Sequence, residues 1–294
     1  MRVVGELSAL GSAFFWAVNS LLVRSQTGRI GAIPLNALQY ACAAVFFWGI
    51  VVPTGRMALV AEIAPLWLAA LMGSALVGMA GGDTMYVRSL GLIGVARAFP
   101  VSISGYLLLT FVVAVAFLGE TLSLRAIVGG VAVAGGISLV GLATSSGGGA
   151  ADGGRGWLLG LLMATGAAVC WTIAVSILKL ALAEVDVVAA NSIRLPTVAL
   201  ALLAIAVGRR DFRPKDYGWR AVSIVGLAGV LGIGVGSLLF LYAVQTAGVA
   251  RTAVLSSTSP LFAVPLSAVF LGERLTVPIV LGTLLCVVGI VLLT

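Results

Sequence analysis

The sequence repeats itself once, at an offset of 155 residues near its start that shrinks to 153 near its end. Polar residues and glycines carry the repeat. The matched positions are Trp16 and Trp171, Arg24 and Lys179, Asn36 and Asn191, Gly78 and Gly232, Gly82 and Gly236, residues 94–97 and 248–251, and residues 118–120 and 271–273. A fixed repeat of this length predicts two structurally equivalent halves.

The chain is too apolar to be a water-soluble protein. Hydrophobic residues make up 61% of it, charged residues only 9%, and its mean hydropathy is +1.19. Soluble domains carry roughly 25% charged residues, and the apolar segments here reach the ~20 residues that cross a bilayer. We therefore expect a multi-pass protein of the plasma membrane or bacterial inner membrane. The net charge of +7 lies in connecting loops, which suits lipid headgroups and not nucleic acid.

Ten apolar segments are predicted to be transmembrane helices, which makes the fold class all-α. They are residues 5–25, 32–52, 65–91, 95–118, 124–143, 156–180, 187–208, 219–246, 249–271 and 276–293. A Ser/Gly-rich stretch between the fifth and sixth segments has the composition of a flexible linker. The predicted domains are a first five-helix repeat at 1–145, a linker at 146–155 and a second five-helix repeat at 156–294.

Five helices per half is an odd number, so the second half enters the membrane from the side opposite to the first. The halves then form an inverted repeat about an axis in the membrane plane, as in many secondary transporters. The side of the termini carries five Lys and Arg residues and the other side eleven. The positive-inside rule favours termini outside the cell. We expect a monomer.

The third and eighth helices carry paired GxxxG-type motifs, Gly78 with Gly82 and Gly232 with Gly236. Small residues at this spacing let two helix backbones approach closely in a membrane. One interpretation is helix packing alone. The other is that these helices slide or bend at the glycines as the two halves move.

The fourth and ninth helices are expected to be interrupted, the fourth at Pro100 and Gly105 and the ninth at Pro260. A proline leaves a carbonyl one turn earlier without its helical donor. Inside a bilayer, irregular backbone is tolerated where it meets protein or a water-filled cavity. The four hydroxyl residues 256–259 are an alternative, local way to satisfy the carbonyl freed by Pro260.

Two ionisable residues lie well inside predicted helices, Asp83 in the third and Arg194 in the seventh. Such residues mark substrate or ion pathways. Asp83 is suited to binding an amine or carrying a proton, with a structural pair to Arg88 as the alternative. Arg194 is suited to a carboxylate or phosphate, with snorkelling to the interface as the alternative. Its repeat-equivalent position holds Gln39.

Aromatic and polar residues cluster in the middle of several helices, which favours lining a cavity over anchoring at the interface. The predicted substrate-binding residues are Trp16, Asn19, Gln39, Asp83, Tyr86, Trp171, Arg194, Tyr242 and Ser256.

Enzyme functions are disfavoured by what the sequence lacks. It has no histidine, no phosphate-binding glycine loop ending in GK[ST], and no second intramembrane aspartate to pair with Asp83 in a protease. We expect no catalytic residues, no metal site and no cofactor.

Two five-helix halves, each with a Trp in its first helix, an Asn three residues before Gln or Arg in its second and Leu-Gly-Glu closing its fourth, resemble the drug/metabolite transporter superfamily. The resemblance is to its EamA type, with the YddG-like amino-acid exporters as the nearest group. It implies a ten-helix basket with a central cavity lined by helices 1–4 and 6–9 and braced by helices 5 and 10. Gln39 departs from the Arg common at that position of the family.

The expected function is export of amino acids or similar small metabolites by alternating access around a site at the middle of the membrane. Two alternatives remain open. A flippase or scramblase of lipid-linked groups would use an Arg cluster such as that at 209–220. A membrane sensor or assembly subunit would bind without transporting.

Overall fold

The structure is a computed structural model that describes residues 2–118, 124–142, 155–181, 184–247, 252, 255–256 and 258–293. Within these ranges the chain is helical and contains no strand. Most of the predicted linker, residues 146–155, falls outside them, as do residues 119–120 and 248–251 of the repeated motifs.

The described helices fall within or near the ten predicted segments, and the ninth segment is described mainly from Ser259 onward. Their bounds are α1 Arg2–Gln26, α2 Ala32–Val51, α3 Met57–Ala61, α4 Pro65–Ala75, η1 Leu76–Gly82, α5 Asp83–Ile93, α6 Val95–Leu118, α7 Leu124–Leu142, α8 Arg155–Ala181, α9 Val187–Gly208, α10 Pro214–Tyr217, α11 Trp219–Ala228, η2 Gly229–Gly236, α12 Ser237–Ala247, α14 Ser259–Leu271 and α15 Val277–Leu293.

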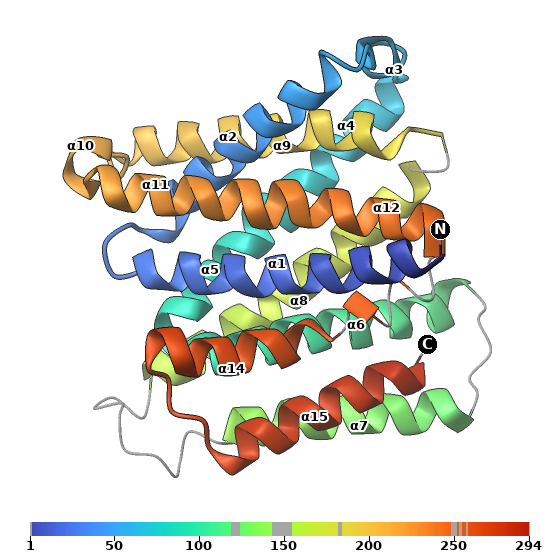
Figure 1. The fold of residues 1–294 in the computed structure, drawn as a ribbon, viewed down its shortest axis with the longest axis vertical. Helices are drawn as coiled ribbons and strands as arrows, with labels where there is room; N and C mark the ends of the chain where they lie inside the picture. Colours follow the sequence, from blue (N-terminus) through green and yellow to red (C-terminus); the bar gives the residue numbers. More distant parts are fainter. Residues whose placement is uncertain are drawn as a thin grey trace.

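The chain is a multi-pass membrane protein. Six helices of the described residues are long and apolar enough to cross a bilayer, and four shorter apolar helices accompany them. The N- and C-termini lie at the same end of the bundle (Figure 1), as an even number of crossings requires. The all-α fold class is confirmed, and the described helices are consistent with five in each of two repeats.

The third and eighth spans are each one continuous helical rod with a π-helical middle. η1 joins α4 to α5, and η2 joins α11 to α12, at equivalent positions of the two repeats. The π-helix is rare, occurs mostly as a short segment inside an α-helix, and is frequent at functional sites. Neither span breaks into two crossings, so the inverted topology is preserved.

Two glycines of each π-helix pack against the first helix of the other repeat. A Cβ atom on Gly82 would lie 2.9 Å from Cδ1 and Nε1 of Trp171, and one on Gly236 would lie 3.1 Å from the same atoms of Trp16. The same cross-repeat packing joins Gly78 to Ala174 and Gly232 to Asn19. The GxxxG motifs therefore pack the two halves together, and whether they also act as hinges stays a prediction.

One of the two predicted helix interruptions is wrong. α6 runs without a break through Pro100 and Gly105. A single missing hydrogen bond early in a helix leaves the remaining ladder intact. In the ninth span, by contrast, Thr258 is a turn residue and α14 starts anew at Ser259, with Pro260 in its first turn. Pro is favoured there because its absent N–H has no helical partner anyway.

Two helices, α7 and α15, lie side by side along one edge of the bundle (Figure 1). A Cβ atom on Gly136 of α7 would lie 2.5 Å from both the Gly282 carbonyl and the Cys286 sulfur of α15. Backbone on the facing side leaves no room for adjustment.

Gly136→Val is therefore expected to destabilise the protein by about 2 kcal/mol through overpacking, which corresponds to an apparent Tm lower by about 4–8 °C. Gly73→Val is the matched control, because nothing lies within 4 Å of a Cβ atom built at Gly73. Thermal unfolding of both variants in one detergent measures the difference. Equal Tm values would contradict the close contact of α7 and α15.

Candidate functional site

The centre of the site is the carboxylate of Asp83, the first residue of α5. One carboxylate oxygen accepts a hydrogen bond from the Tyr40 hydroxyl of α2, and the other accepts one from Trp171 Nε1 of α8 at 2.5 Å. The π-helical η1 ends immediately before Asp83, so its turn sets the direction of this side chain. The first repeat thus supplies the acid and one donor, and the second repeat supplies the other donor.

The indole of Trp171, which bonds Asp83, packs against two other aromatic rings. The Trp171 ring lies 5.4 Å from that of Tyr86 and 6.2 Å from that of Tyr106, centroid to centroid. The Tyr86 hydroxyl is 2.8 Å from Ser20 Oγ on α1. Edge and tilted ring pairs of this kind pack favourably, and they fix the indole that bonds Asp83.

A ladder of polar side chains runs along the contact between α2 and α9. Gln39 Nε2 donates to Asn36 Oδ1 at 3.0 Å, and Arg194 Nη1 donates to Asn191 Oδ1 at 3.3 Å. The two bonds are equivalent under the repeat. Asn36 also donates to Thr84 Oγ1 at 3.3 Å, which links the ladder to α5 beside Asp83.

Arg194 is a buried cation with an unused donor. The residue is only 7% exposed, its Nε has no hydrogen-bond partner, and no carboxylate of the described residues lies at ion-pair distance. Its charge acts on Asp83 and Tyr40 through space. The snorkelling alternative is wrong, because the guanidinium is inside the bundle. An unpaired buried charge is costly.

The equivalent corner of the second repeat has no acid. The Trp16 ring packs against that of Phe240 with centroids 5.5 Å apart, as Trp171 packs against Tyr86. The position equivalent to Asp83 is held by Ser237. Asn19, beside Gly232, has a buried Oδ1 with no partner. Trp16 and Asn19 therefore line this corner, and the contacts described for them do not reach Asp83.

Two further predicted substrate-binding residues, Tyr242 and Ser256, also have no described contact with Asp83. Tyr242 on α12 is 43% exposed. Ser256 is buried, and its Oγ is 3.4 Å from Ser12 Oγ on α1. The alternative pairing of Asp83 with Arg88 is also wrong, because Arg88 is exposed and Asp83 is bonded to Tyr40 and Trp171.

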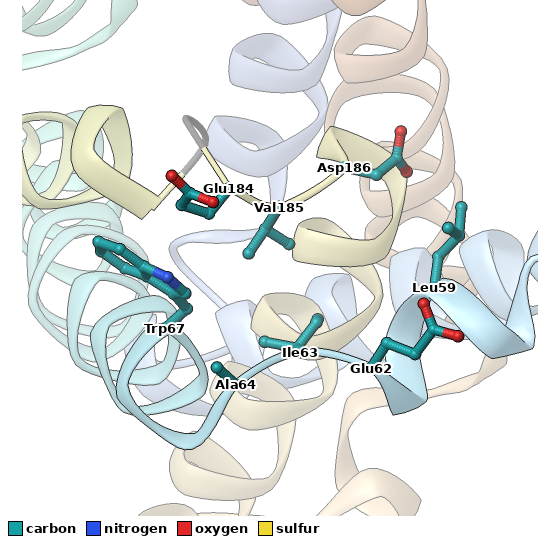
Figure 2. Close-up of a pocket in the computed structure, with 8 residues that line it drawn as sticks. All are labelled: Leu59, Glu62, Ile63, Ala64, Trp67, Glu184, Val185 and Asp186. Carbon is teal, nitrogen blue, oxygen red and sulfur yellow. The ribbon is translucent and has the colours of Figure 1, made fainter.

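A pocket of about 310 Å³ lies between the connection from α3 to α4 and the connection from α8 to α9 (Figure 2). Its lining residues are Leu59, Glu62, Ile63, Ala64, Trp67, Glu184, Val185 and Asp186. No predicted substrate-binding residue is among them, so this pocket is distinct from the Asp83 cluster. Asp186 is also the N-cap of α9, accepting from the Val188 and Ala189 N–H groups at 3.0 Å each.

Tyr40 is the residue that the sequence prediction missed. It is 1% exposed and donates directly to Asp83. Its repeat-equivalent residue is Leu195. The signal that could have identified Tyr40 is this difference between the copies: a tyrosine beside Gln39 in the first repeat and a leucine at the equivalent position of the second.

Comparisons with known proteins agree with this architecture. The model of the EamA-like transporter family matches residues 3–142 and 158–294. An uncharacterized transporter of Archaeoglobus fulgidus is 27% identical over 288 residues, covering 98% of this chain and 96% of that protein. A protein of known crystal structure superposes with a TM-score of 0.69 at 19% identity, covering 100% of this chain and 98% of that one, which shows a shared fold.

Both copies of the repeat fall within the matched ranges, and the matches together span nearly the whole chain. The partly buried Asp83 and the buried Arg194 lie one in each matched copy. This chain is a member of the EamA-like transporter family.

Proposed function

We propose that the protein is a secondary transporter that exports amino acids or closely similar small zwitterions by alternating access. The observation that supports this most is the pair of oppositely charged side chains inside the bundle, the partly buried Asp83 from the first repeat and the buried Arg194 from the second. They interact through space but form no ion pair with each other. A zwitterion offers a matching charge to each.

Arg194 is suited to the carboxylate of such a substrate. A guanidinium presents several N–H donors in a planar fork that matches two carboxylate oxygens, and at least one of these donors is unused here. Asp83 is suited to the ammonium group or to a transported proton. A substrate bearing both groups would compensate the charge of Arg194 without leaving new charge in the bundle.

Equivalent packing of the two π-helices supports alternating access. Each half holds the first helix of the other through Gly82 with Trp171 or Gly236 with Trp16. Inverted repeats built from matching contacts can exchange conformations, so that inward-open and outward-open states have similar energies. The site that contains Asp83 and Arg194, which differ between the repeats, would then open to one side of the membrane in one state and to the other side in the other state.

Flux into proteoliposomes tests the proposal. Purified protein should accelerate entry of at least one labelled amino acid far above empty liposomes, with saturation and competition by unlabelled substrate. Failure to move any amino acid that empty liposomes exclude would overturn the substrate assignment. Movement of a labelled lipid in the same vesicles, with no amino-acid flux, would favour a scramblase.

A further inference from the structure

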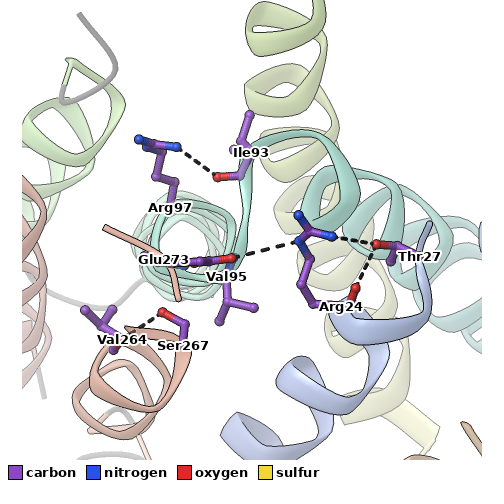
Figure 3. A network of polar contacts seen from close by, with 9 residues as sticks. Arg24, Thr27, Ile93, Val95, Arg97, Val264, Ser267 and Glu273 are labelled. Carbon is purple, nitrogen blue, oxygen red and sulfur yellow. Dashed lines mark hydrogen bonds and ion pairs between the residues drawn. The ribbon is translucent and has the colours of Figure 1, made fainter. Parts of the chain in front are cut away.

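Two repeated motifs have no role in the substrate site, namely Leu271-Gly272-Glu273 and the stretch 94–97. In the structure they meet (Figure 3). We propose that Glu273 is the latch that holds the transporter closed at the end where α1 finishes and α6 begins. The proposal rests on the alternating-access part of the proposed function and not on the identity of the substrate.

The end of α14 aims Glu273 at α6. α14 ends at Leu271, and Gly272 takes a left-handed conformation with φ +66°, which suits glycine because it lacks a Cβ atom. The Glu273 N–H then donates back to the Ser267 carbonyl at 3.3 Å, closing the helix end. This turn carries the side chain away from its own helix and toward the first repeat.

The Glu273 carboxylate binds the first turn of α6 with both oxygens. Oε1 accepts from the Val95 N–H and Oε2 from the Ala96 N–H, each at 2.9 Å. These N–H groups have no partner within their own helix. A negative charge at a helix N-terminus is favourable, and hydrogen bonds to an ionised group are stronger than neutral ones. A side chain of the second repeat thus caps a helix of the first.

Gly94 makes this approach possible. Its φ is +79°, and a Cβ atom on it would lie 2.6 Å from Glu273 Oε1. Any other residue at this position would be strained and would displace the carboxylate. The glycine of the motif therefore provides the space and the two residues after it provide the donors.

Arg24 adds a weaker contact from α1. Its Nε is 3.9 Å from Glu273 Oε1, and the side chains of Arg24 and Glu273 are 34% and 17% exposed. An ion pair at this distance and exposure contributes little, so the backbone cap dominates. If the hydrogen bonds of Glu273 to α6 break, Arg24 remains nearby as an ion-pair partner for the exposed carboxylate.

The contact joins the halves across the apolar core beneath it. Ala98 on α6 and Ala263 on α14 are both 0% exposed and belong to the same cluster as Leu21 of α1. If the two halves move apart at this end, the two hydrogen bonds of Glu273 must break before this core is exposed. Glu273 is therefore a positioning residue that sets the balance between closed and open states.

Cysteine labelling tests the latch. Ala98→Cys reports on the latched end, and Ala190→Cys, on a residue 1% exposed among Leu71, Val185 and Ala189, reports on a separate core. Both reporters are placed in a background without Cys42, Cys170 and Cys286. Purified protein in detergent is reacted with a maleimide, and the ratio of the two labelling rates is measured.

Glu273→Gln removes the charge and one acceptor, and should raise the rate at Ala98→Cys relative to Ala190→Cys by about tenfold, given the strength of hydrogen bonds to charged groups. Gly94→Ala keeps the charge of Glu273 but puts a Cβ atom where the carboxylate lies, so it should also raise the labelling rate at Ala98→Cys relative to Ala190→Cys. Glu62→Gln, at a carboxylate of the pocket beside α3, is the matched control and should leave the ratio unchanged.

An unchanged ratio in Glu273→Gln, or an equal rise at both reporters, overturns the latch, since the latter indicates general loosening of the fold. The measurement needs no substrate. A protein that moves no amino acid can therefore still pass or fail it, which separates this proposal from the substrate assignment.

Discussion

Asp83→Asn is expected to abolish flux driven by a pH gradient and to reduce substrate flux without a gradient by about 100-fold, the effect of losing a hydrogen-bonded charge. Asparagine has nearly the same shape, but its amide nitrogen cannot accept a hydrogen bond. Asp83 accepts from Tyr40 on one oxygen and from Trp171 on the other. If the asparagine oxygen keeps the bond from Trp171, its amide nitrogen must donate to the Tyr40 hydroxyl, which then loses the acceptor for its own proton. The negative charge near Arg194 would also be lost.

Proteoliposomes with an imposed pH gradient provide the measurement. The matched control is Asp186→Asn, the same chemical change at an exposed N-cap, where asparagine caps as well as aspartate. That variant should transport normally. If Asp83→Asn retains the full response to the gradient, Asp83 carries no proton. If it also retains full flux, Asp83 does not contact the substrate.

Arg194→Gln is expected to eliminate transport of substrates that carry a carboxylate while leaving the protein as stable as before or more stable. The substitution places in the second repeat the residue that the first repeat has at Gln39. It removes a buried cation that has no ion-pair partner among the described residues, which favours stability. It also removes the donor fork for a carboxylate, which we expect to cost at least about 100-fold in apparent affinity.

The opposite signs of these two effects make the result diagnostic. Flux and thermal stability are measured on the same preparation, with Arg209→Gln at the exposed end of α9 as the control for loss of charge. A fall in both stability and flux would mean that Arg194 is a structural residue. If Arg194→Gln transports at the full rate, Arg194 does not bind the carboxylate of the substrate.

The topology and part of the site were predictable because they depend on where the sequence repeats and where it does not. Matched glycines such as Gly82 and Gly236 predicted close helix contacts, and the structure has them in both halves. Asp83 and Arg194 stood out because charge is costly inside a membrane. Both belong to positions at which the two copies differ.

Other features depend on packing between segments far apart in the chain, which spacing alone does not encode. η1 and η2 look like ordinary helix in sequence, and their extra residue per turn follows from the neighbours that the glycines admit. The partner of Glu273 is 178 residues away in the chain, at Val95. α6 tolerates Pro100 because its remaining hydrogen bonds persist, which a residue-by-residue reading of prolines cannot anticipate.

Sharing Asp83 between the halves has a consequence for how the protein is made. The third span must enter the bilayer when Tyr40 has been synthesised but Trp171 has not. At about 5–20 residues per second, the carboxylate waits several seconds for its second donor. We expect this span to stay beside the insertion machinery until α8 arrives, and an isolated first half to be degraded and not to assemble.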